Sequence, residues 1–257
     1  MEIGKAFTFM FDDEKWVQKL AIGGLLLLAS IIPLVNIFTG LVVVGYTLRV
    51  LKNVSEGSST PLPEWDDWGG DFVKGLMTAL AALIYAIPIL LVSGASAIVS
   101  AVAANSSDAE AVAGICVAAL SCLSGLWGLL MGVTLPAAVV KYVQSGEFGA
   151  FFRFGAILTF IKDNLGNYVI ALLLSVVAGL VAGLGFIACV IGIFFTQFWG
   201  NLVGMHLLGQ VAYQAKPQTV AAAAGVGIAR YGELEEVSFT APEPPEPVEP
   251  KGEETQQ

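Results

Sequence analysis

The amino-acid sequence predicts an all-α integral membrane protein with six transmembrane helices arranged as three hairpins. Apolar residues make up 56% of the 257 residues, charged residues only 13%, and the mean hydropathy is +0.78. This composition is typical of membrane proteins rather than of soluble enzymes. Two further observations support it: apolar stretches too long for a soluble core, and a tryptophan-rich segment that separates them.

The tryptophan-rich segment covers residues 61–72. It contains Trp65, Trp68 and four carboxylates but no Lys or Arg. Tryptophan is enriched at the membrane–water interface, where its ring contacts acyl chains and its N–H stays hydrated. We therefore expect an in-plane hinge between two membrane-buried hairpins.

The first hairpin is predicted at about residues 14–54. Its uncharged run, residues 20–48, exceeds the roughly 20 residues of one crossing but is short for two. The stretch 33–36 begins with a proline and should end or kink a helix. A tight hairpin is favoured, while a re-entrant loop and one long kinked helix remain open. Two crossings require the flanking charged side chains to extend to the surface, namely Lys15, Lys19, Arg49 and Lys52.

The other two hairpins are predicted at about residues 72–141 and 164–215. Pro88 and Pro136 should kink the helices of the second hairpin, which membrane helices tolerate. The turn of the third hairpin is expected between Gly183 and Gly192.

A short aromatic segment precedes each hairpin, and we expect each to form a helix in the membrane interface. These segments lie within residues 2–12, 65–68 and 147–162. Each precedes or contains a pair of polar residues that can cap the next helix, namely Asp12–Asp13, Asp66–Asp67 and Asp163–Asn164.

The acidity of the chain belongs to its C-terminal end. The net charge is −9, but eight Glu and one Lys lie after residue 231, so the remaining chain carries only −2. We predict a membrane domain at residues 1–216, a juxtamembrane linker at 217–239 and a disordered Pro/Glu-rich tail at 240–257. The tail could dock a cytosolic protein. No basic stripe suggests nucleic-acid binding.

Lys and Arg predict the orientation. They occur near the two termini and in the two connectors between hairpins, and the three hairpin tips contain none. By the positive-inside rule, both termini are cytoplasmic and every hairpin returns the chain to the same side. We expect a multi-pass membrane protein.

The sequence offers no catalytic motif of the common hydrolase, metalloprotease or nucleotide-binding types. The three cysteines lie in apolar runs without metal-ligand spacing, so we expect buried small side chains. We therefore expect no enzyme activity, no cofactor and no bound metal.

Two clusters of polar residues are candidate functional sites. The carboxylates of Glu64, Asp66, Asp67 and Asp71 could bind a hard cation, but a hydrated, helix-capping turn is the simpler interpretation. A second set could line a polar path through the membrane or bond between packed helices, namely Gln197, Asn201, His206 and Gln210.

Pairs of glycines four residues apart allow close helix packing, within one chain or between chains. They are Gly128/Gly132, Gly179/Gly183 and Gly200/Gly204.

One stretch carries a family resemblance. Gly45-Tyr46 with Arg49, Leu62-Pro-Glu-Trp-Asp-Asp-Trp68, Gly75-Leu76 and Tyr85 with Pro88 resemble the domain-of-unknown-function family 4013 of bacterial and archaeal multi-pass proteins. The resemblance implies a helical membrane fold and a location in the plasma membrane of a prokaryote, but no mechanism. It marks a candidate interfacial motif of eight residues, namely Gly45, Tyr46, Arg49, Pro63, Trp65, Asp66, Asp67 and Trp68.

Three functions follow in order of preference. The first is a non-enzymatic structural or partner-binding membrane domain. The second is a permease or channel component for a neutral or small solute. The third is an enzyme acting on lipid. It is the least preferred because the sequence offers no nucleophile–base pair and no metal cluster.

Overall fold

The computed structural model describes residues 1–104, 107–188 and 191–223, and all regular secondary structure in these ranges is helical. The contacts discussed below lie within one compact unit, Met1–Thr219. The tail predicted at residues 240–257 lies outside the described residues.

The N-terminal part forms four helices, α1 (Ile3–Thr8), the 3₁₀ helix η1 (Phe9–Asp12), α2 (Trp16–Ala29) and α3 (Pro33–Glu56). The break predicted near the proline lies just before it, and Pro33 begins α3 instead of ending a helix. Proline suits a first helical position because its missing N–H needs no partner there. Gly57 ends α3 with φ of 80°, a left-handed conformation that glycine adopts without steric cost.

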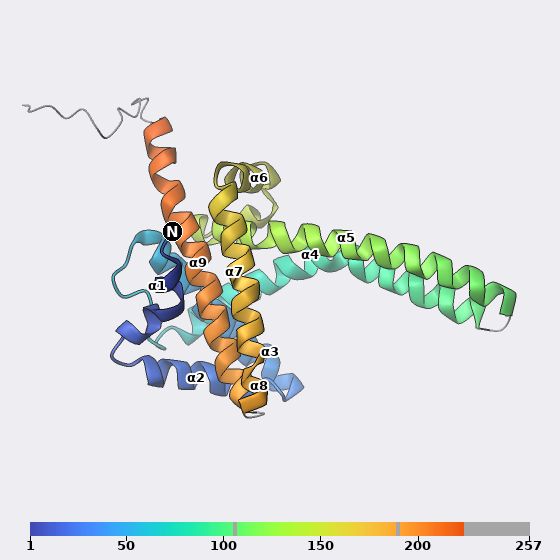
Figure 1. Cartoon of the computed structure of the whole chain (residues 1–257), viewed down its shortest axis with the longest axis horizontal. Helices are drawn as coiled ribbons and strands as arrows, with labels where there is room; N and C mark the ends of the chain where they lie inside the picture. The colour runs from blue at the N-terminus through green and yellow to red at the C-terminus, as the bar shows by residue number, and fades with distance from the viewer. Residues whose placement is uncertain (105–106, 189–190, 224–257) are drawn as a thin grey trace, which may run out of the picture. The chain divides into compact units, whose positions relative to one another are not determined.

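The second pair of helices is α4 (Trp68–Ala103) and α5 (Ser107–Ser145), which run side by side (Figure 1). Both continue through their internal prolines, Pro88 and Pro136. Asp67 caps α4, because its Oδ1 accepts a hydrogen bond of 2.9 Å from the Gly70 N–H. The expected capping role of Asp67 is thus confirmed.

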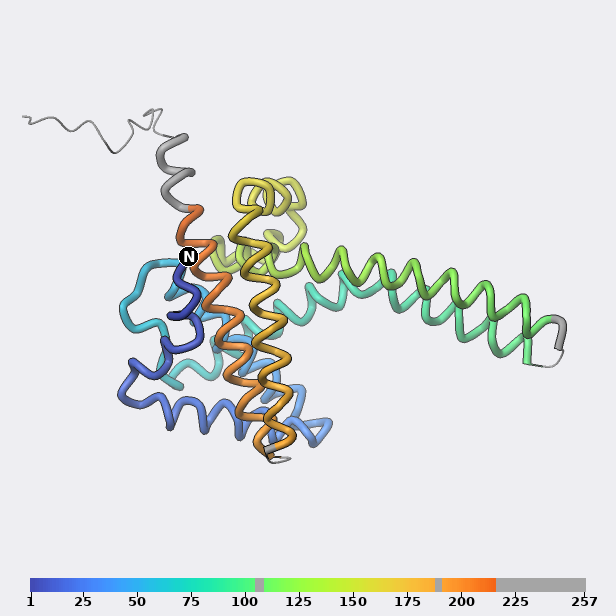
Figure 2. Tube along the Cα trace, viewed as in Figure 1, coloured from blue at the N-terminus to red at the C-terminus, as the bar shows by residue number. Residues whose placement is uncertain are grey.

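The C-terminal part contains the 3₁₀ helix η2 (Phe148–Phe152), α6 (Phe154–Asp163), α7 (Leu165–Gly183), α8 (Gly185–Ala188) and α9 (Gly192–Ala223). Helices α7 and α9 lie side by side, as the tube trace shows (Figure 2). Helix α7 ends at Gly183 and α9 begins at Gly192, the two glycines between which the sequence predicts the turn.

Within the described residues, four helices are long and apolar enough to cross a membrane. They are α3, α4, residues Ala109–Ser145 of α5, and the segment Leu165–Ile187, while α2 is a shorter apolar helix of 14 residues. The all-helical, apolar architecture that the sequence predicts is confirmed at this level.

The aromatic segments differ from one another. Short helices are present before the first and third pairs, as α1 with η1 and as η2 with α6. The second pair has none: Trp65 lies in an irregular turn and Trp68 is the first residue of α4.

The cysteines also differ from expectation. Cys116 and Cys122 are exposed on α5 rather than buried in the core, and Cys189 lies outside the described residues. Their apolar surroundings in the sequence belong to an outward face of α5, where neighbouring large side chains such as Ile115 and Leu123 are exposed too. An apolar run in a membrane protein indicates contact with lipid as readily as burial in protein.

Candidate functional site

The polar and aromatic residues of the connector gather into one cluster between α2, α3 and the start of α4, which we call the hinge site. It consists of Asp13, Lys19, Gly45, Tyr46, Arg49, Asp71 and the connector residues 62–68. Segments up to about 60 residues apart in sequence contribute to it, so the cluster is a product of the fold.

An aromatic stack forms its centre. The rings of Tyr46 and Trp65 lie 3.9 Å apart between centroids with 13° between their planes. The Tyr46 hydroxyl donates to the Pro63 carbonyl at 2.8 Å, and Trp65 Nε1 donates to the Lys19 carbonyl at 3.1 Å. Both polar atoms of the stack are therefore bonded, as buried tyrosine and tryptophan require. Trp68 Nε1 donates to the Trp65 carbonyl at 3.0 Å and continues the cluster toward α4.

Arg49 connects α3 to both the connector and α4. Its Nη1 lies 2.8 Å from Asp66 Oδ1, and its Nη2 lies 2.7 Å from Asp71 Oδ2. The same Nη2 donates to the Glu64 carbonyl at 2.8 Å. A planar guanidinium suits this position because it presents several donors in a fixed arrangement.

The Arg49–Asp71 pair is buried at its acidic end, where the Asp71 side chain is only 1% exposed. Asp71 Oδ1 and Arg49 Nε have no hydrogen-bond partner among the described residues. Lys74 lies 4.0 Å from Asp71 Oδ1, which adds a second positive charge without a hydrogen bond.

Lys19 makes the corresponding connection from α2. Its Nζ lies 2.6 Å from Asp13 Oδ2 and 3.1 Å from Glu64 Oε1, and it donates to the Leu62 carbonyl at 3.1 Å. The side chain is only 4% exposed. The expectation that Lys19 extends to the surface is therefore wrong: the connector folds over it and supplies Glu64 and the Leu62 carbonyl as acceptors, and Asp13 supplies the third.

Two glycines permit α3 and α4 to pack closely at this site. A Cβ atom on Gly45 would lie 1.8 Å from the Asp71 carbonyl oxygen, and one on Gly75 would lie 1.9 Å from the Leu41 carbonyl oxygen. Both obstacles are backbone atoms, so neither can rotate away. The glycines of the predicted motif thus fix the crossing of the two helices.

The charges of the connector are mutually stabilising. The hydrogen bond from Lys19 holds the pKa of Glu64 below its ordinary value, and the hydrogen bond from Arg49 does the same for the pKa of Asp66. The Gly70 N–H, followed by Lys74, lowers the pKa of Asp67. These three carboxylates therefore remain ionised well into the acidic range.

All eight residues of the candidate interfacial motif lie in this cluster. The sequence does not identify Asp13 or Lys19 as members of the cluster. It also does not predict that Asp71 is buried, since the connector carboxylates are expected to stay hydrated. Asp71 follows the cap residue Asp67 by one turn, and Arg49 follows Gly45 by one turn. This equal spacing of four residues is the signal in the sequence, because it places Arg49 next to Asp71 when α3 and α4 cross at Gly45.

The ion pairs of the connector carboxylates bear on the alternative interpretation, a cation site. Each of its carboxylates is paired with a positive side chain: Glu64 with Lys15 and Lys19, Asp66 and Asp71 with Arg49, and Asp67 with Lys74. The residues that the structure describes contain no group of three or more potential metal ligands.

The candidate polar path lies on α9, and its members face different surroundings. Gln197 is exposed, Asn201 is half-buried, and His206 is buried with its ring stacked on Phe9 at 4.3 Å. Gln210 bonds His206 Nδ1 at 3.2 Å and exchanges two hydrogen bonds with the backbone of Glu2. His206 and Gln210 thus attach the N-terminal segment to α9.

Two cavities adjoin these elements. A cavity of 610 Å³ is lined by His206, Gln210 and Tyr213 of α9 together with residues 1, 2, 5 and 57–59, among others. A second cavity, of 350 Å³, is almost entirely apolar and lies between α4, α5 and α6, lined by Tyr85, Trp127 and Phe154, among others.

Comparison with known proteins identifies the family. A search among curated proteins finds no match, and a search among solved structures finds none either. The sequence model of the family described as "Protein of unknown function (DUF4013)" matches residues 27–191, which include the α3–α4 crossing and most of the hinge site. The chain therefore belongs to the DUF4013 family.

Proposed function

We propose that this protein is a non-enzymatic membrane domain that binds a transmembrane helix of a partner on the outer face of its α4–α5 hairpin. The hinge site serves this function by holding α4 rigidly against α3. The observation that carries the proposal is a contrast between one glycine pair that the chain itself fills and two pairs that are open.

The filled pair lies on α9. A Cβ atom on Gly200 would meet Ala182 and Ala178 of α7 at 3.2 and 3.3 Å, and one on Gly204 would meet Ser175 at 3.4 Å. These glycines let α7 and α9 pack closely, as small residues do between membrane helices.

Two pairs are open, Gly179/Gly183 on α7 and Gly128/Gly132 on α5, and only the α5 pair is extended by a third open glycine. A Cβ atom on Gly128 or Gly132 would meet nothing within 4 Å, and the same holds for Gly125 one turn away. Large apolar side chains around them, such as Leu126 and Leu129, are exposed. The face combines a small-residue groove with apolar margins, which is the surface that membrane helices use for association.

An apolar cavity of 350 Å³ lies beside the same hairpin, on the side of α5 away from these glycines, and is a separate apolar surface. It adjoins α5 near Trp127, whose Nε1 donates to the Tyr85 carbonyl at 2.9 Å and so fixes α5 to α4. A rigid hairpin with a lateral apolar cavity suits binding of another apolar surface better than it suits solute passage.

The alternative, a permease for a small neutral solute, is favoured by the cavity of 610 Å³, which His206 and Gln210 line. That cavity does not include Gln197 or Asn201 among its lining residues. A continuous polar path therefore requires a second conformation in which Gln197 and Asn201 also line the cavity.

The proposed topology has both termini in the cytoplasm of a prokaryotic cell and an even number of crossings in each hairpin. Support comes from the distribution of Lys and Arg. At 1.5 Å per residue, the 14 residues of α2 extend about 21 Å, less than the roughly 30 Å of a hydrocarbon core. Helix α2 therefore enters the membrane as a re-entrant element or crosses a locally thinned bilayer.

Cysteine labelling tests the topology. In a background without native cysteines, Ser107→Cys at the α4–α5 tip should react with an impermeant thiol reagent in intact cells. Ser58→Cys should react only after permeabilisation. The opposite pattern would reverse the orientation.

Cross-linking in native membranes tests the partner proposal. We expect a short apolar cross-linker to give a discrete adduct with the wild type, which Gly128→Leu with Gly132→Leu abolishes. The matched control is Gly94→Leu, because Gly94 of α4 also has nothing within 4 Å but has Leu90 and Ile98 four residues away. If all three proteins give the same adduct, or none gives one, the α5 face is not a docking surface. Differently tagged copies distinguish a second copy of this chain from another protein.

A further inference from the structure

The apolar cavity of 350 Å³ is enclosed by four elements, namely α4, α5, η2 and α6. Its lining residues on α5 lie on the side of that helix opposite the open glycines. Among the described residues, no charged side chain lines it. The cavity is therefore a site distinct from the helix-docking face.

The polar side chains in the wall of the cavity already have hydrogen-bond partners. The Tyr85 hydroxyl donates to the Phe151 carbonyl at 2.6 Å, and Trp127 Nε1 donates to the Tyr85 carbonyl at 2.9 Å. The Thr134 hydroxyl donates to the Leu130 carbonyl at 2.8 Å. A buried water needs about two to four polar partners, which these side chains do not offer. The cavity is thus suited to an apolar occupant rather than to water.

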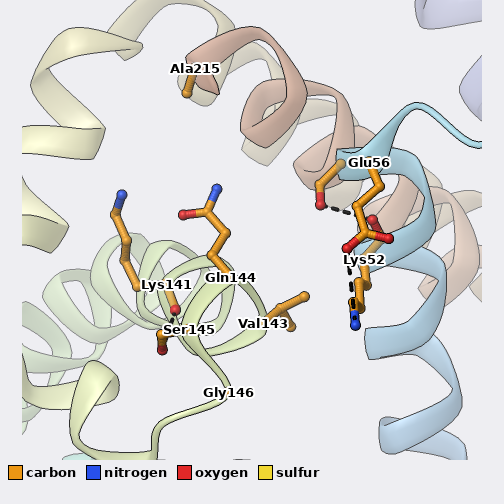
Figure 3. Close-up of a pocket in the computed structure, with 9 residues that line it drawn as sticks. Lys52, Glu56, Lys141, Val143, Gln144, Ser145, Gly146 and Ala215 are labelled. Atoms are coloured by element: carbon orange, nitrogen blue, oxygen red, sulfur yellow. Dashed lines mark hydrogen bonds and ion pairs between the residues drawn. The ribbon is translucent and has the colours of Figure 1, made fainter. Parts of the chain in front are cut away.

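The polar cleft between α3, α5 and α9 has the opposite character. Its volume is 470 Å³, and Figure 3 shows Lys52 and Lys141 on different sides of it. Lys52 contacts Glu56 at 4.0 Å, and Lys141 Nζ lies 4.9 Å from the centre of the Phe160 ring. The two ammonium groups point apart, so they do not define a common ligand. This cleft suits water, and the apolar cavity does not.

Contacts at both ends of α6 hold the apolar cavity open. Before α6, the Tyr85 hydroxyl bonds the Phe151 carbonyl, and the Tyr85 ring lies 5.9 Å from the ring of Phe152. After α6, the hydroxyl of Tyr168 in α7 donates to the Val133 carbonyl of α5 at 2.6 Å. Helix α6 cannot move onto α4 and α5 without breaking these contacts. The cavity is therefore preformed, which lowers the cost of binding a ligand.

The mouth of the cavity opens on the apolar surface of the protein. Ile84, Leu130 and Leu158 line the cavity and are exposed, whereas Thr134 and Ile157 line it and are buried. Ile84 and Leu130 belong to α4 and α5, which are long and apolar enough to cross a membrane. The mouth is therefore continuous with the surface that contacts lipid, and an occupant enters from the bilayer.

The size of the cavity suits part of a hydrocarbon chain. An apolar cavity of about 150 Å³ binds benzene, so this one has room for roughly twice as many carbon atoms. We propose that it binds one acyl chain of a membrane phospholipid, inserted between α6 and the α4–α5 hairpin. The chain supplies the van der Waals contacts that the facing walls do not make with each other.

Native mass spectrometry of the purified full chain tests the proposal. We expect the wild type to keep one phospholipid after exchange into lipid-free detergent, because a chain between helices has contacts on several sides. Leu130→Trp should lose this lipid, because the larger indole fills the cavity from its mouth.

The matched control is Leu123→Trp. Leu123 lies seven residues before Leu130 on the same face of α5, is also exposed and does not line the cavity. This variant should keep the lipid, as should Leu158→Ala, which enlarges the cavity. Thermal melts check that each variant is folded.

A second measurement needs no variant. Phosphatidylcholine with a diazirine at the end of one acyl chain, in vesicles with the wild type, should label Met131 and Thr134 inside the cavity.

Three results would overturn the proposal: a wild type that keeps no phospholipid, a folded Leu130→Trp that keeps as much as the wild type, or labelling confined to outward positions such as Leu123. If the retained molecule has no acyl chain, the cavity binds another apolar compound and the lipid assignment is wrong.

Discussion

Arg49 of α3 contacts Asp71 of α4 with 2.7 Å between Nη2 and Oδ2, one helical turn from the point where Gly45 touches the Asp71 backbone. Asp71 of α4 thus contacts α3 through both its main chain and its side chain. The glycine sets the distance between the helices, and the ion pair requires that distance. The two features of the family motif therefore act as one unit.

Replacement of Asp71 by Asn should destabilise the protein markedly. The change breaks the buried contact with Arg49, which keeps only the exposed Asp66 carboxylate and the Glu64 carbonyl as partners. Loss of one partner of a buried ion pair costs about 3 kcal/mol or more. For a chain of this size, that corresponds to a fall of roughly 10 °C in melting temperature, measured in detergent. Asp66→Asn should cost far less, because the Asp66 side chain is 71% exposed and such pairs contribute little.

A double replacement separates charge from packing. Arg49→Met with Asp71→Leu substitutes apolar side chains for the pair and should recover much of the loss seen in Asp71→Asn. A double variant less stable than Asp71→Asn would instead show that the other Arg49 contacts, with Asp66 and the Glu64 carbonyl, dominate.

Gly45→Ala should prevent normal packing of α3 on α4. The new methyl group would lie 1.8 Å from the Asp71 carbonyl oxygen, so the helices must separate and the Arg49–Asp71 pair must lengthen. We expect loss of folded protein in size-exclusion chromatography. The control is Gly114→Ala in α5, which meets nothing within 4 Å and should be neutral or stabilising by about 0.5–1 kcal/mol. Equal behaviour of the two variants would contradict the close crossing.

The sequence predicts the helical class, the break near Pro33 and the turn after Gly183, because local chemistry determines each of them. It also identifies the motif around Trp65, because aromatic and acidic residues concentrate there in an apolar chain. It does not predict that Lys19 and Asp71 are buried. Their burial depends on partners from other elements, Glu64 for Lys19 and Arg49 for Asp71, and no local pattern records such long-range pairing.

The sequence also does not predict which residues of the apolar runs are exposed on the outer faces of the helices. The sequence assigns Cys116 and Cys122 to an apolar run, which in a soluble protein would indicate burial. Among the residues that the structure describes, no other helix covers the outer faces of α4 and α5 over much of their length, as Figure 1 shows. Apolar character alone does not distinguish lipid contact from protein contact.

Acidic pH should weaken the hinge site. The pKa values of Asp66 and Glu64 are lowered from ordinary values of 3.8 and 4.5 by the hydrogen bonds from Arg49 and Lys19. A group with a lowered folded-state pKa contributes its full stabilisation above the ordinary pKa and loses it as the pH falls through the lowered one. We expect the melting temperature to be steady above about pH 5 and to decline below it.

Variants assign that decline to the hinge. Glu64→Gln with Asp66→Asn should have a lower melting temperature at neutral pH and a shallower acidic decline than the wild type. Glu110→Gln, which removes an exposed carboxylate of α5, should leave the decline unchanged. Identical acidic slopes for the wild type and the hinge variant would place the pH-sensitive groups elsewhere.

The Tyr46–Trp65 stack gives the last prediction. Trp65 contributes a ring that lies 3.9 Å from Tyr46 and an N–H that donates to the Lys19 carbonyl. Trp65→Phe keeps most of the stacking and loses the hydrogen bond, which should cost about 1 kcal/mol. Trp65→Ala also loses the stacking, worth about 0.5–1.5 kcal/mol, and much of the buried apolar area, so it should be clearly less stable. Thermal melts in detergent and in reconstituted bilayers should rank the proteins as wild type, Phe, Ala. If Phe is as unstable as Ala, the hydrogen bond to α2 rather than the aromatic contact holds the connector in place, and the anchoring role assigned to the ring is wrong.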